Sequence, residues 1–258
     1  MANRLGLEFE LRKGVFVRDR KLWQGFKLGS TKHMFGEFQT MIWEFLPYIL
    51  GGVVWTLGLV GGGLGMGFAI GLPVAAGQAF GNRETNAILS AYVWFFRSIP
   101  LLVLLFLFYW GIFPALGYKL DPLACSIAVL GIRSGAYQSQ IFRGAIESVG
   151  EGQLMAARTL GMSKTKGIYH IVLPQALRVS IPGWANEYAI MLKDSAITFA
   201  LGVLEILTRT RYVVMATMDP FLPYFFAGGV FIVLTYGGTK IINLVYEKTK
   251  VPGLIRRA

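Results

Sequence analysis

The chain has 258 residues, of which 54% are hydrophobic and 15% are charged, and its formal charge is +11. Soluble domains usually hold about a quarter of their residues as Asp, Glu, Lys or Arg, so this composition excludes an ordinary soluble protein. The charge does not indicate a nucleic-acid-binding protein, because the basic residues flank apolar segments and no zinc spacing or basic–aromatic run is present.

Long apolar stretches indicate an integral membrane protein. No charged residue stands between Glu44 and Arg83, and about 20 apolar residues are enough for a helix to cross a bilayer. The single cysteine, Cys125, cannot form a disulfide within the chain. Residues 1–34 lack the apolar region of a signal peptide, so we expect the first membrane helix to direct insertion.

The pattern predicts an all-α protein with five membrane-spanning segments. The first lies within residues 45–74 and is rich in glycine. Its Gly61 and Gly65 are spaced for close approach of a second helix, although glycine is also common in membrane helices generally. We expect Pro73 and Gly77 to end this segment.

The second segment is predicted over residues 87–113, with an interruption at Arg97-Ser98-Ile99-Pro100. Here Arg97 is expected to hold a kinked helix in place, with substrate contact as the second interpretation.

The third, fourth and fifth segments are predicted over residues 122–146, 181–204 and 221–245. The third and fourth carry ionisable and amide side chains, which are costly against lipid, so both are expected to line an interior or a subunit interface.

The polar stretches set the expected topology. Residues 147–180 and the tail, 248–258, are rich in Lys and Arg and are therefore placed in the cytoplasm. Counting back through three crossings places the N-terminus outside. Residues 1–44 form a polar arm that ends in an amphipathic helix, near residues 35–45, lying on the membrane surface.

Residues 147–180 carry more local structure than an ordinary basic connector would. Gln153–Leu160 has a helical pattern, and Gly161 can adopt the left-handed conformation that ends a helix. Ser163 can cap a second short helix through about Val172, with Pro174 after it. The apolar face of such a two-helix unit could dock into a groove on a soluble partner.

At these residues the chain resembles the permeases of type I ABC importers, in the branch that carries polar amino acids. Their coupling loop reads E-A-A, three residues, glycine, about nine residues, then I-x-L-P. Here it stands as Met155-Ala156-Ala157, Gly161 and Ile171-Val172-Leu173-Pro174. Residues 97–102, 141–146, 175–178, 182, 186–187, 192–195 and 202–203 agree as well. Met155 replaces the usual acidic residue, so a polar contact to the ATPase is missing or is supplied by Glu151.

The resemblance covers residues 45–247 and implies the working partners. Two permease chains, identical or paralogous, would form the pathway, and two separate ABC ATPase subunits would hold the coupling loops. An extracytoplasmic binding protein would deliver the amino acid at the cytoplasmic (inner) membrane, and transport would proceed by alternating access. The residues expected to couple to the ATPase are Gln153, Met155, Ala156, Ala157, Leu160, Gly161 and Pro174.

This chain has no G-x-x-x-x-G-K-[ST] loop, so the partner ATPase must use the ATP. We expect no catalytic residue, metal or cofactor in the chain itself. An intramembrane enzyme is disfavoured because no H-E-x-x-H or G-x-S-x-G motif is present. A channel or receptor would give no reason for the two-helix loop. An importer of another zwitterion, such as an opine, stays open.

Polar residues of the fourth segment are the predicted substrate pathway. Asn186 and Glu187 match a pair common in the family, and Asp194 lies about two helical turns after Glu187 on the same face, with Met191 between them. Two carboxylates would suit a cationic amino acid. The alternative for Asp194 is an ion pair with a neighbouring lysine or an arginine of another segment. Gln138, on the third segment, either lines the pathway or bonds between helices.

Overall fold

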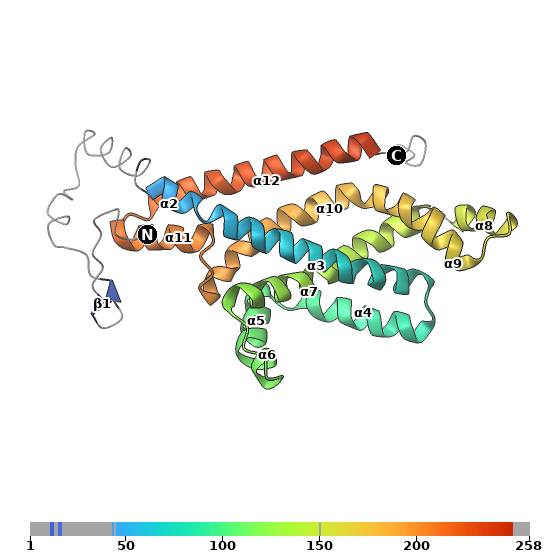
Figure 1. Ribbon diagram of the computed structural model, residues 1–258, viewed down its shortest axis with the longest axis horizontal. Helices are drawn as coiled ribbons and strands as arrows, with labels where there is room; N and C mark the ends of the chain where they lie inside the picture. The colour runs from blue at the N-terminus through green and yellow to red at the C-terminus, as the bar shows by residue number, and fades with distance from the viewer. Residues whose placement is uncertain (1–10, 13–14, 17–42, 44, 150, 250–258) are drawn as a thin grey trace.

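The structure, a computed structural model, describes residues 11–12, 15–16, 43, 45–149 and 151–249. The long helices run along the longest axis of the molecule (Figure 1). Two short helices, α8 (Glu151–Thr159) and α9 (Lys164–Gly167), lie at one end, and α11 (Ile206–Thr217) lies at the other. The predicted all-α membrane domain is confirmed, and the described strands are confined to one two-residue pair near the N-terminus. Most of the predicted surface helix and most of the basic tail lie outside the described residues.

The other elements follow in chain order. They are β1 (Leu11–Arg12), β2 (Val15–Phe16), α2 (Leu46–Leu50), α3 (Val53–Phe80), α4 (Arg83–Ser98), α5 (Leu101–Phe106), the π-helix η4 (Leu107–Ile112), α6 (Phe113–Ala115), α7 (Pro122–Val149), the π-helix η5 (Ile168–Val172), α10 (Leu173–Ser195), the 3₁₀-helix η6 (Ala196–Leu201) and α12 (Phe221–Thr249). The two strands form a short antiparallel pair.

Among the described residues, two stretches, 46–80 and 221–249, are long and apolar enough to cross a bilayer. Residues 83–115 qualify as a third only if both arms belong to one span, because the axis turns by 105° within them. The helices α7 and α10 are also long enough to cross a bilayer, but their polar residues make them less apolar than these stretches. The count of five spans stays a prediction.

The break in the second segment lies where the sequence predicts it. Ile99 is extended, with φ −92° and ψ 133°, between the end of α4 and the start of α5. A residue before proline is driven out of the helical region by the proline ring, so Pro100 accounts for the bend.

Two predicted helix ends are wrong. The helix α3 does not stop at Pro73 or Gly77 but continues to Phe80, because neighbouring groups can satisfy a backbone freed by proline in a membrane helix. Pro174 does not follow a helix end either: α9, η5 and α10 are continuous. A wide π turn before Pro174 relieves the clash that its ring would make with a carbonyl one turn earlier.

Glycines of α3 bring α7 unusually close. A Cβ on Gly67 would lie 2.8 Å from Cβ of Ser134, and one on Gly71 would lie 2.9 Å from the backbone oxygen of Gly135. Gly61 and Gly65, the predicted pair, have nothing within 4 Å of that position. Close helix packing inside the described chain therefore uses a different face of α3 from the one predicted.

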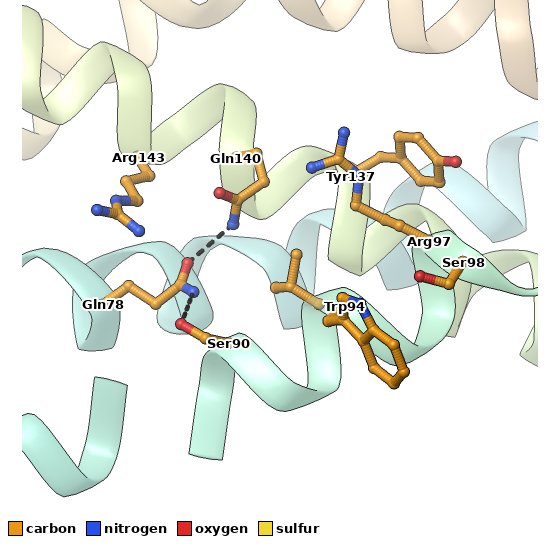
Figure 2. Close-up of a pocket in the computed structure, with 9 residues that line it drawn as sticks. Gln78, Ser90, Trp94, Arg97, Ser98, Tyr137, Gln140 and Arg143 are labelled. Carbon is orange, nitrogen blue, oxygen red and sulfur yellow. Dashed lines mark hydrogen bonds between the residues drawn. The ribbon is translucent and has the colours of Figure 1, made fainter. Parts of the chain in front are cut away.

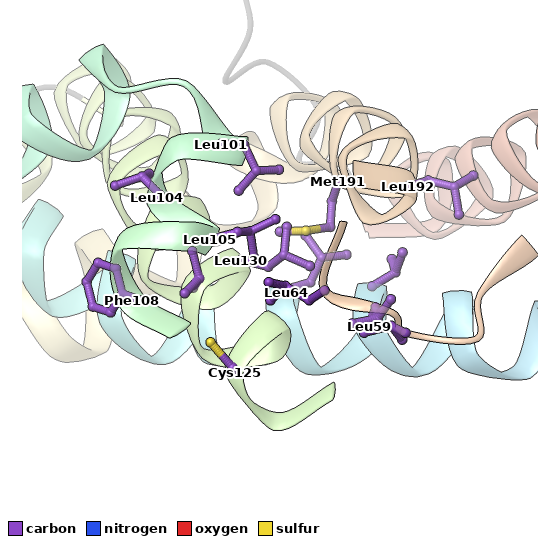
Figure 3. Close-up of a cluster of buried hydrophobic side chains, with 14 residues drawn as sticks. Leu59, Leu64, Leu101, Leu104, Leu105, Phe108, Cys125, Leu130, Met191 and Leu192 are labelled. Carbon is purple, nitrogen blue, oxygen red and sulfur yellow. The ribbon is translucent and has the colours of Figure 1, made fainter. Parts of the chain in front are cut away.

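The largest apolar cluster fills the space where α3, α5, α7 and α10 meet (Figure 3). Leu104 of α5, Leu130 of α7 and Leu192 of α10 are all buried in it. Because α5 bends away from α4, it places its leucines over this cluster instead of continuing along the long axis.

The glycine contact gives a first prediction. Gly67→Leu should destabilise the protein by about 1–3 kcal/mol or prevent folding, because the new side chain overlaps α7. The measurement is thermal unfolding of the purified protein in detergent. Gly65→Leu, on the open face of the same helix, is the control and should leave the melting temperature unchanged; equal losses in both variants would contradict the assigned packing.

Candidate functional site

The helices α8 and α9 form a compact unit around one glycine turn. Gly161 has φ +83°, the left-handed conformation predicted for it. Ser163 caps α9, and its hydroxyl accepts a hydrogen bond from the Lys166 N–H at 3.4 Å. Ala157 is buried and lies against Gly167, so the two short helices pack without room for a larger side chain. The predicted glycine turn between two helical segments is confirmed, but the second segment is not a separate short helix, because it continues through η5 into α10.

The exposed surface of this unit carries large apolar side chains among polar and basic ones. Met155 is 63% exposed and Leu160 is 84% exposed, and Tyr169 also projects outward from the π segment that follows. The exposed basic residues of the unit include Arg158, on the same helix as Met155. Such a surface fits a partner groove with an apolar floor.

The unit is joined to the membrane domain without a flexible linker. Helical backbone runs from Lys164 through η5 and α10 to Leu201. Gly202, with φ +84°, then ends the helix. A displacement of the short helices therefore acts directly on α10.

One face of α10 meets α7 in a buried polar network. Ser134 donates a hydrogen bond to Glu187 at 2.6 Å. Gln138 donates to the same hydroxyl at 3.0 Å and to the Leu64 carbonyl of α3 at 3.1 Å, and it accepts from the Trp184 indole at 2.8 Å. Ser134, Gln138 and Glu187 are almost completely buried. This network of buried hydrogen bonds links α3, α7 and α10, and it is called the α10 network below.

An ion pair lies next to this network. Arg133 of α7 pairs with Asp194 of α10, and their side chains are only 16% and 18% exposed. The Arg133 guanidinium also stacks on the Tyr137 ring, 4.8 Å from its centre, and Arg97 of α4 lies over the same ring at 4.9 Å. Asp194 therefore makes the ion pair with an arginine of another segment that the sequence left as an alternative.

The structure brings most of the predicted pathway residues together. Glu187, Met191 and Asp194 share one face of α10, as their spacing predicts, and this face points at α3 and α7. Gln138 joins them from α7. Asn186 does not: its side chain is exposed on another face. Whether these residues touch substrate stays a prediction.

Several residues of the network were missed from the sequence. Arg133, Ser134 and Trp184 contact predicted residues, and Tyr137 contacts Arg133. Each belongs to a segment whose neighbours are set only by the tertiary fold. A partial signal existed in α7, where Arg133 and Tyr137 are four residues apart and so share one face.

The chain is similar to known membrane transport proteins. Residues 67–248 match the family described as binding-protein-dependent transport system inner membrane component. The nopaline transport system permease protein NocM of Agrobacterium fabrum is 32% identical over 79% of this chain and 88% of its own length. The histidine/lysine/arginine/ornithine transport system permease protein HisQ of Escherichia coli is 30% identical over 76% of this chain and 90% of its own length.

Among solved structures, the crystal structure of an amino acid ABC transporter with histidines superposes with a TM-score of 0.74 at 28% identity. The match covers 82% of this chain and 98% of that one.

The buried ion pair gives a second prediction. Asp194→Asn should cost about 3–5 kcal/mol, because it leaves the Arg133 charge without its partner in a poorly solvated place. Glu147→Gln is the control, since the Arg143–Glu147 pair is 36% and 58% exposed and should be worth less than about 1 kcal/mol. Thermal unfolding in detergent measures both. Equal effects would mean that water screens the inner pair as well as the outer one.

Proposed function

Since the chain belongs to the binding-protein-dependent transport system inner membrane components and is a permease subunit of an amino acid ABC importer, we propose that it moves a polar amino acid inward by alternating access. The chain supplies the path, and a separate ATPase supplies the energy. The observation that carries this proposal is the continuous helical connection between the exposed α8–α9 unit and the polar face of α10.

The α8–α9 unit is the proposed coupling loop. Its exposed Met155 and Leu160 would enter a groove of the ATPase, and its buried Ala157 and left-handed Gly161 would keep its shape. Met155 stands where the family usually has an acidic residue, so apolar burial replaces a charged contact in this interface.

The proposed assembly follows from the family. A second permease chain, identical or paralogous, completes the pathway, and two ATPase subunits bind the coupling loops in the cytoplasm. An extracytoplasmic binding protein delivers cargo at the far end of the molecule, where α11 lies (Figure 1). The C-terminus would lie in the cytoplasm and the N-terminus outside. ATP-driven approach of the ATPases would turn α10 as a rigid body.

The proposed cargo is a polar, cationic amino acid. Glu187 and Asp194 share one face of α10, and an ionisable residue inside a membrane is costly enough to indicate a function. With Asp194 paired to Arg133, Glu187 is the carboxylate that is left to meet a cation. An opine remains the second candidate, because NocM is named for nopaline transport.

A third prediction tests the coupling loop. Gly161→Val should uncouple ATP hydrolysis from uptake, because a β-branched residue cannot readily adopt φ +83° and the turn between α8 and α9 would deform. Uptake and ATPase rates are measured on the complex reconstituted with its ATPase and binding protein. Gly152→Val is the control, since nothing lies within 4 Å of that position and its φ is not positive. Normal uptake by Gly161→Val would exclude the assigned role.

A fourth prediction tests the cargo. Glu187→Gln keeps an oxygen that can accept the Ser134 hydrogen bond but removes the negative charge. Uptake of L-arginine or L-lysine should fall at least tenfold, whereas uptake of any neutral amino acid that is carried should change less than threefold. Parallel ATP-dependent uptake assays with labelled amino acids measure both. Equal loss for cationic and neutral cargo would assign Glu187 to structure alone.

A further inference from the structure

A second polar site lies outside the α10 network. A hollow of about 380 Å³ opens between α3, α4 and α7 (Figure 2). Arg97 of α4 and Arg143 of α7 line it from opposite sides, and Trp94 and Tyr137 are its aromatic lining residues. None of its lining residues is Asp or Glu. The charged residues that line it, Arg97 and Arg143, are therefore both cationic, whereas Glu187 carries a carboxylate.

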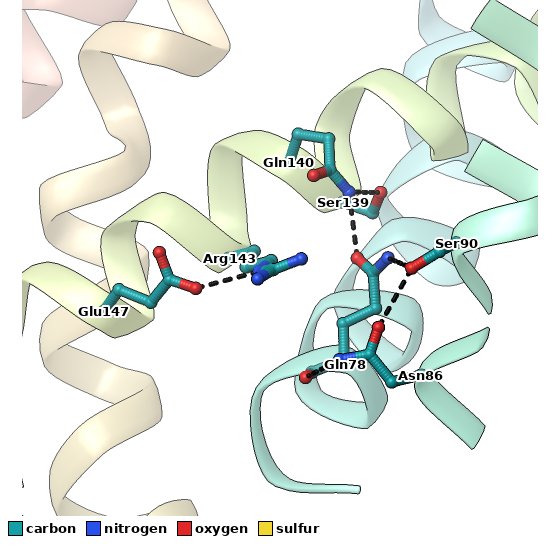
Figure 4. Close-up of polar contacts among 7 residues, drawn as sticks. All are labelled: Gln78, Asn86, Ser90, Ser139, Gln140, Arg143 and Glu147. Atoms are coloured by element: carbon teal, nitrogen blue, oxygen red, sulfur yellow. Dashed lines mark hydrogen bonds and ion pairs between the residues drawn. The ribbon is translucent and has the colours of Figure 1, made fainter. Parts of the chain in front are cut away.

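Amide and hydroxyl groups hold the floor of the hollow in place. Gln140 donates a hydrogen bond to the Gln78 side-chain oxygen at 2.9 Å, and Gln78 donates to Ser90 at 3.1 Å (Figure 4). Ser90 in turn donates to Asn86, which donates to the Gln78 backbone oxygen. Because these groups satisfy one another, the floor is neutral and ordered, and it adds no charge to the hollow.

The nearby carboxylates are already used. Asp194 pairs with Arg133, and Glu147 accepts the Arg143 Nε–H at 2.8 Å. Within the part of the chain that the structure describes, Arg97 has the Tyr137 ring as its contact and no carboxylate within ion-pair distance. It shares that ring with Arg133, a second cation. Among the described residues, the exposed Arg97 guanidinium is therefore left available for an anionic ligand.

The depth of Arg97 separates it from the lipid headgroups of the cytoplasmic leaflet. The helix α4 begins at the same end of the molecule as α8 and α9, the cytoplasmic end under the proposed function (Figure 1). Arg97 follows Arg83 by 14 residues on a helix that rises about 1.5 Å per residue, which places it about 21 Å along. A hydrocarbon layer is about 30 Å thick, so a lipid headgroup does not reach this position from the cytoplasmic surface.

We infer that this hollow binds the carboxylate of the transported amino acid, with the Arg97 guanidinium as its donor. The inference rests on the proposed function. A planar guanidinium binds a carboxylate through two parallel N–H···O bonds, and the Arg97 side chain is exposed and so open to such a ligand. Trp94 and Tyr137 would cover the adjacent carbon atoms. Recognition of charge would thus be divided: α4 selects the carboxylate end of the cargo, and Glu187 selects its cationic end.

The test is equilibrium binding to the detergent-solubilised permease–ATPase complex, without the binding protein. The probes are labelled L-arginine, L-histidine and L-glutamine, with agmatine and histamine, which lack the carboxylate, as competitors. For the wild type, agmatine should compete at least tenfold less well than L-arginine. Arg97→Gln should weaken amino acid binding at least tenfold and remove the preference over the amine. Arg97→Lys keeps the charge but loses the planar guanidinium. Its affinity for the amino acids should lie between those of the wild type and Arg97→Gln.

Two further variants separate binding from folding. Gln140→Glu places a negative charge in the lining of the hollow but cannot donate the hydrogen bond to Gln78, so its thermal unfolding is measured alongside. With unfolding unchanged, it should weaken binding of the amino acid more than that of the amine. Lys119→Gln, an exposed change between α6 and α7, is the control and should leave binding unchanged.

Unchanged affinity and selectivity in Arg97→Gln would overturn the inference, as would equal competition by agmatine and L-arginine in the wild type. Loss of the second permease chain from Arg97→Gln complexes would also overturn it, because Arg97 would then pair with a carboxylate of that partner. ATP-dependent uptake by the wild type is measured alongside. If uptake occurs while Arg97→Gln binds normally, only this site fails; if no amino acid is bound or carried, the proposed function fails as well.

Discussion

The close contact between α3 and α7 is the constraint on which the polar centre of this protein depends. Gly67 and Gly71 leave no space for a side chain at that contact, so the backbones of the two helices can approach. At this separation Gln138 reaches the Leu64 carbonyl across the interface, and Ser134 is left facing α10. In lipid the hydrophobic effect does not drive helices together, so packing and interhelical hydrogen bonds must hold this arrangement. The close approach at Gly67 and Gly71 and the hydrogen bond from the Gln138 side-chain amide therefore depend on each other.

Local patterns in the sequence predicted local structure well. The glycine turn at Gly161 and the cap at Ser163 are each decided by a few neighbouring residues, and both were predicted correctly. The sequence predicts an end of α3 at Pro73 because proline ends most soluble helices, whereas a membrane helix can continue through it. The π segment that carries the helix past Pro174 has no short sequence signature. The helix α11 was not predicted at all, although the side chain of Glu205 caps its start.

Contacts between distant segments could not be predicted from the sequence. The spacing of Glu187 and Asp194 shows that they share a face, but the identity of the arginine that faces Asp194 depends on how α7 is rotated. The hollow beside Arg97 combines residues from three helices, and no segment alone suggests it. In the resulting arrangement each charge inside the helical bundle lies against an opposite charge, a polar hydrogen or an aromatic ring, as a medium of low polarity requires.

The continuous helix from Lys164 to Leu201 has a consequence for how such a chain can change over time. Each residue of an α-helix advances the side-chain direction by about 100°, so one inserted or deleted residue between Ser163 and Glu187 would turn Glu187 away from Ser134. Substitutions in this stretch alter one contact each, whereas a change in its length shifts every contact beyond it. A length change in the loop between α6 and α7 would not rotate side chains about a helix axis in this way. We expect the spacing from Gly161 to Asp194 to be kept more strictly than the residues that fill it.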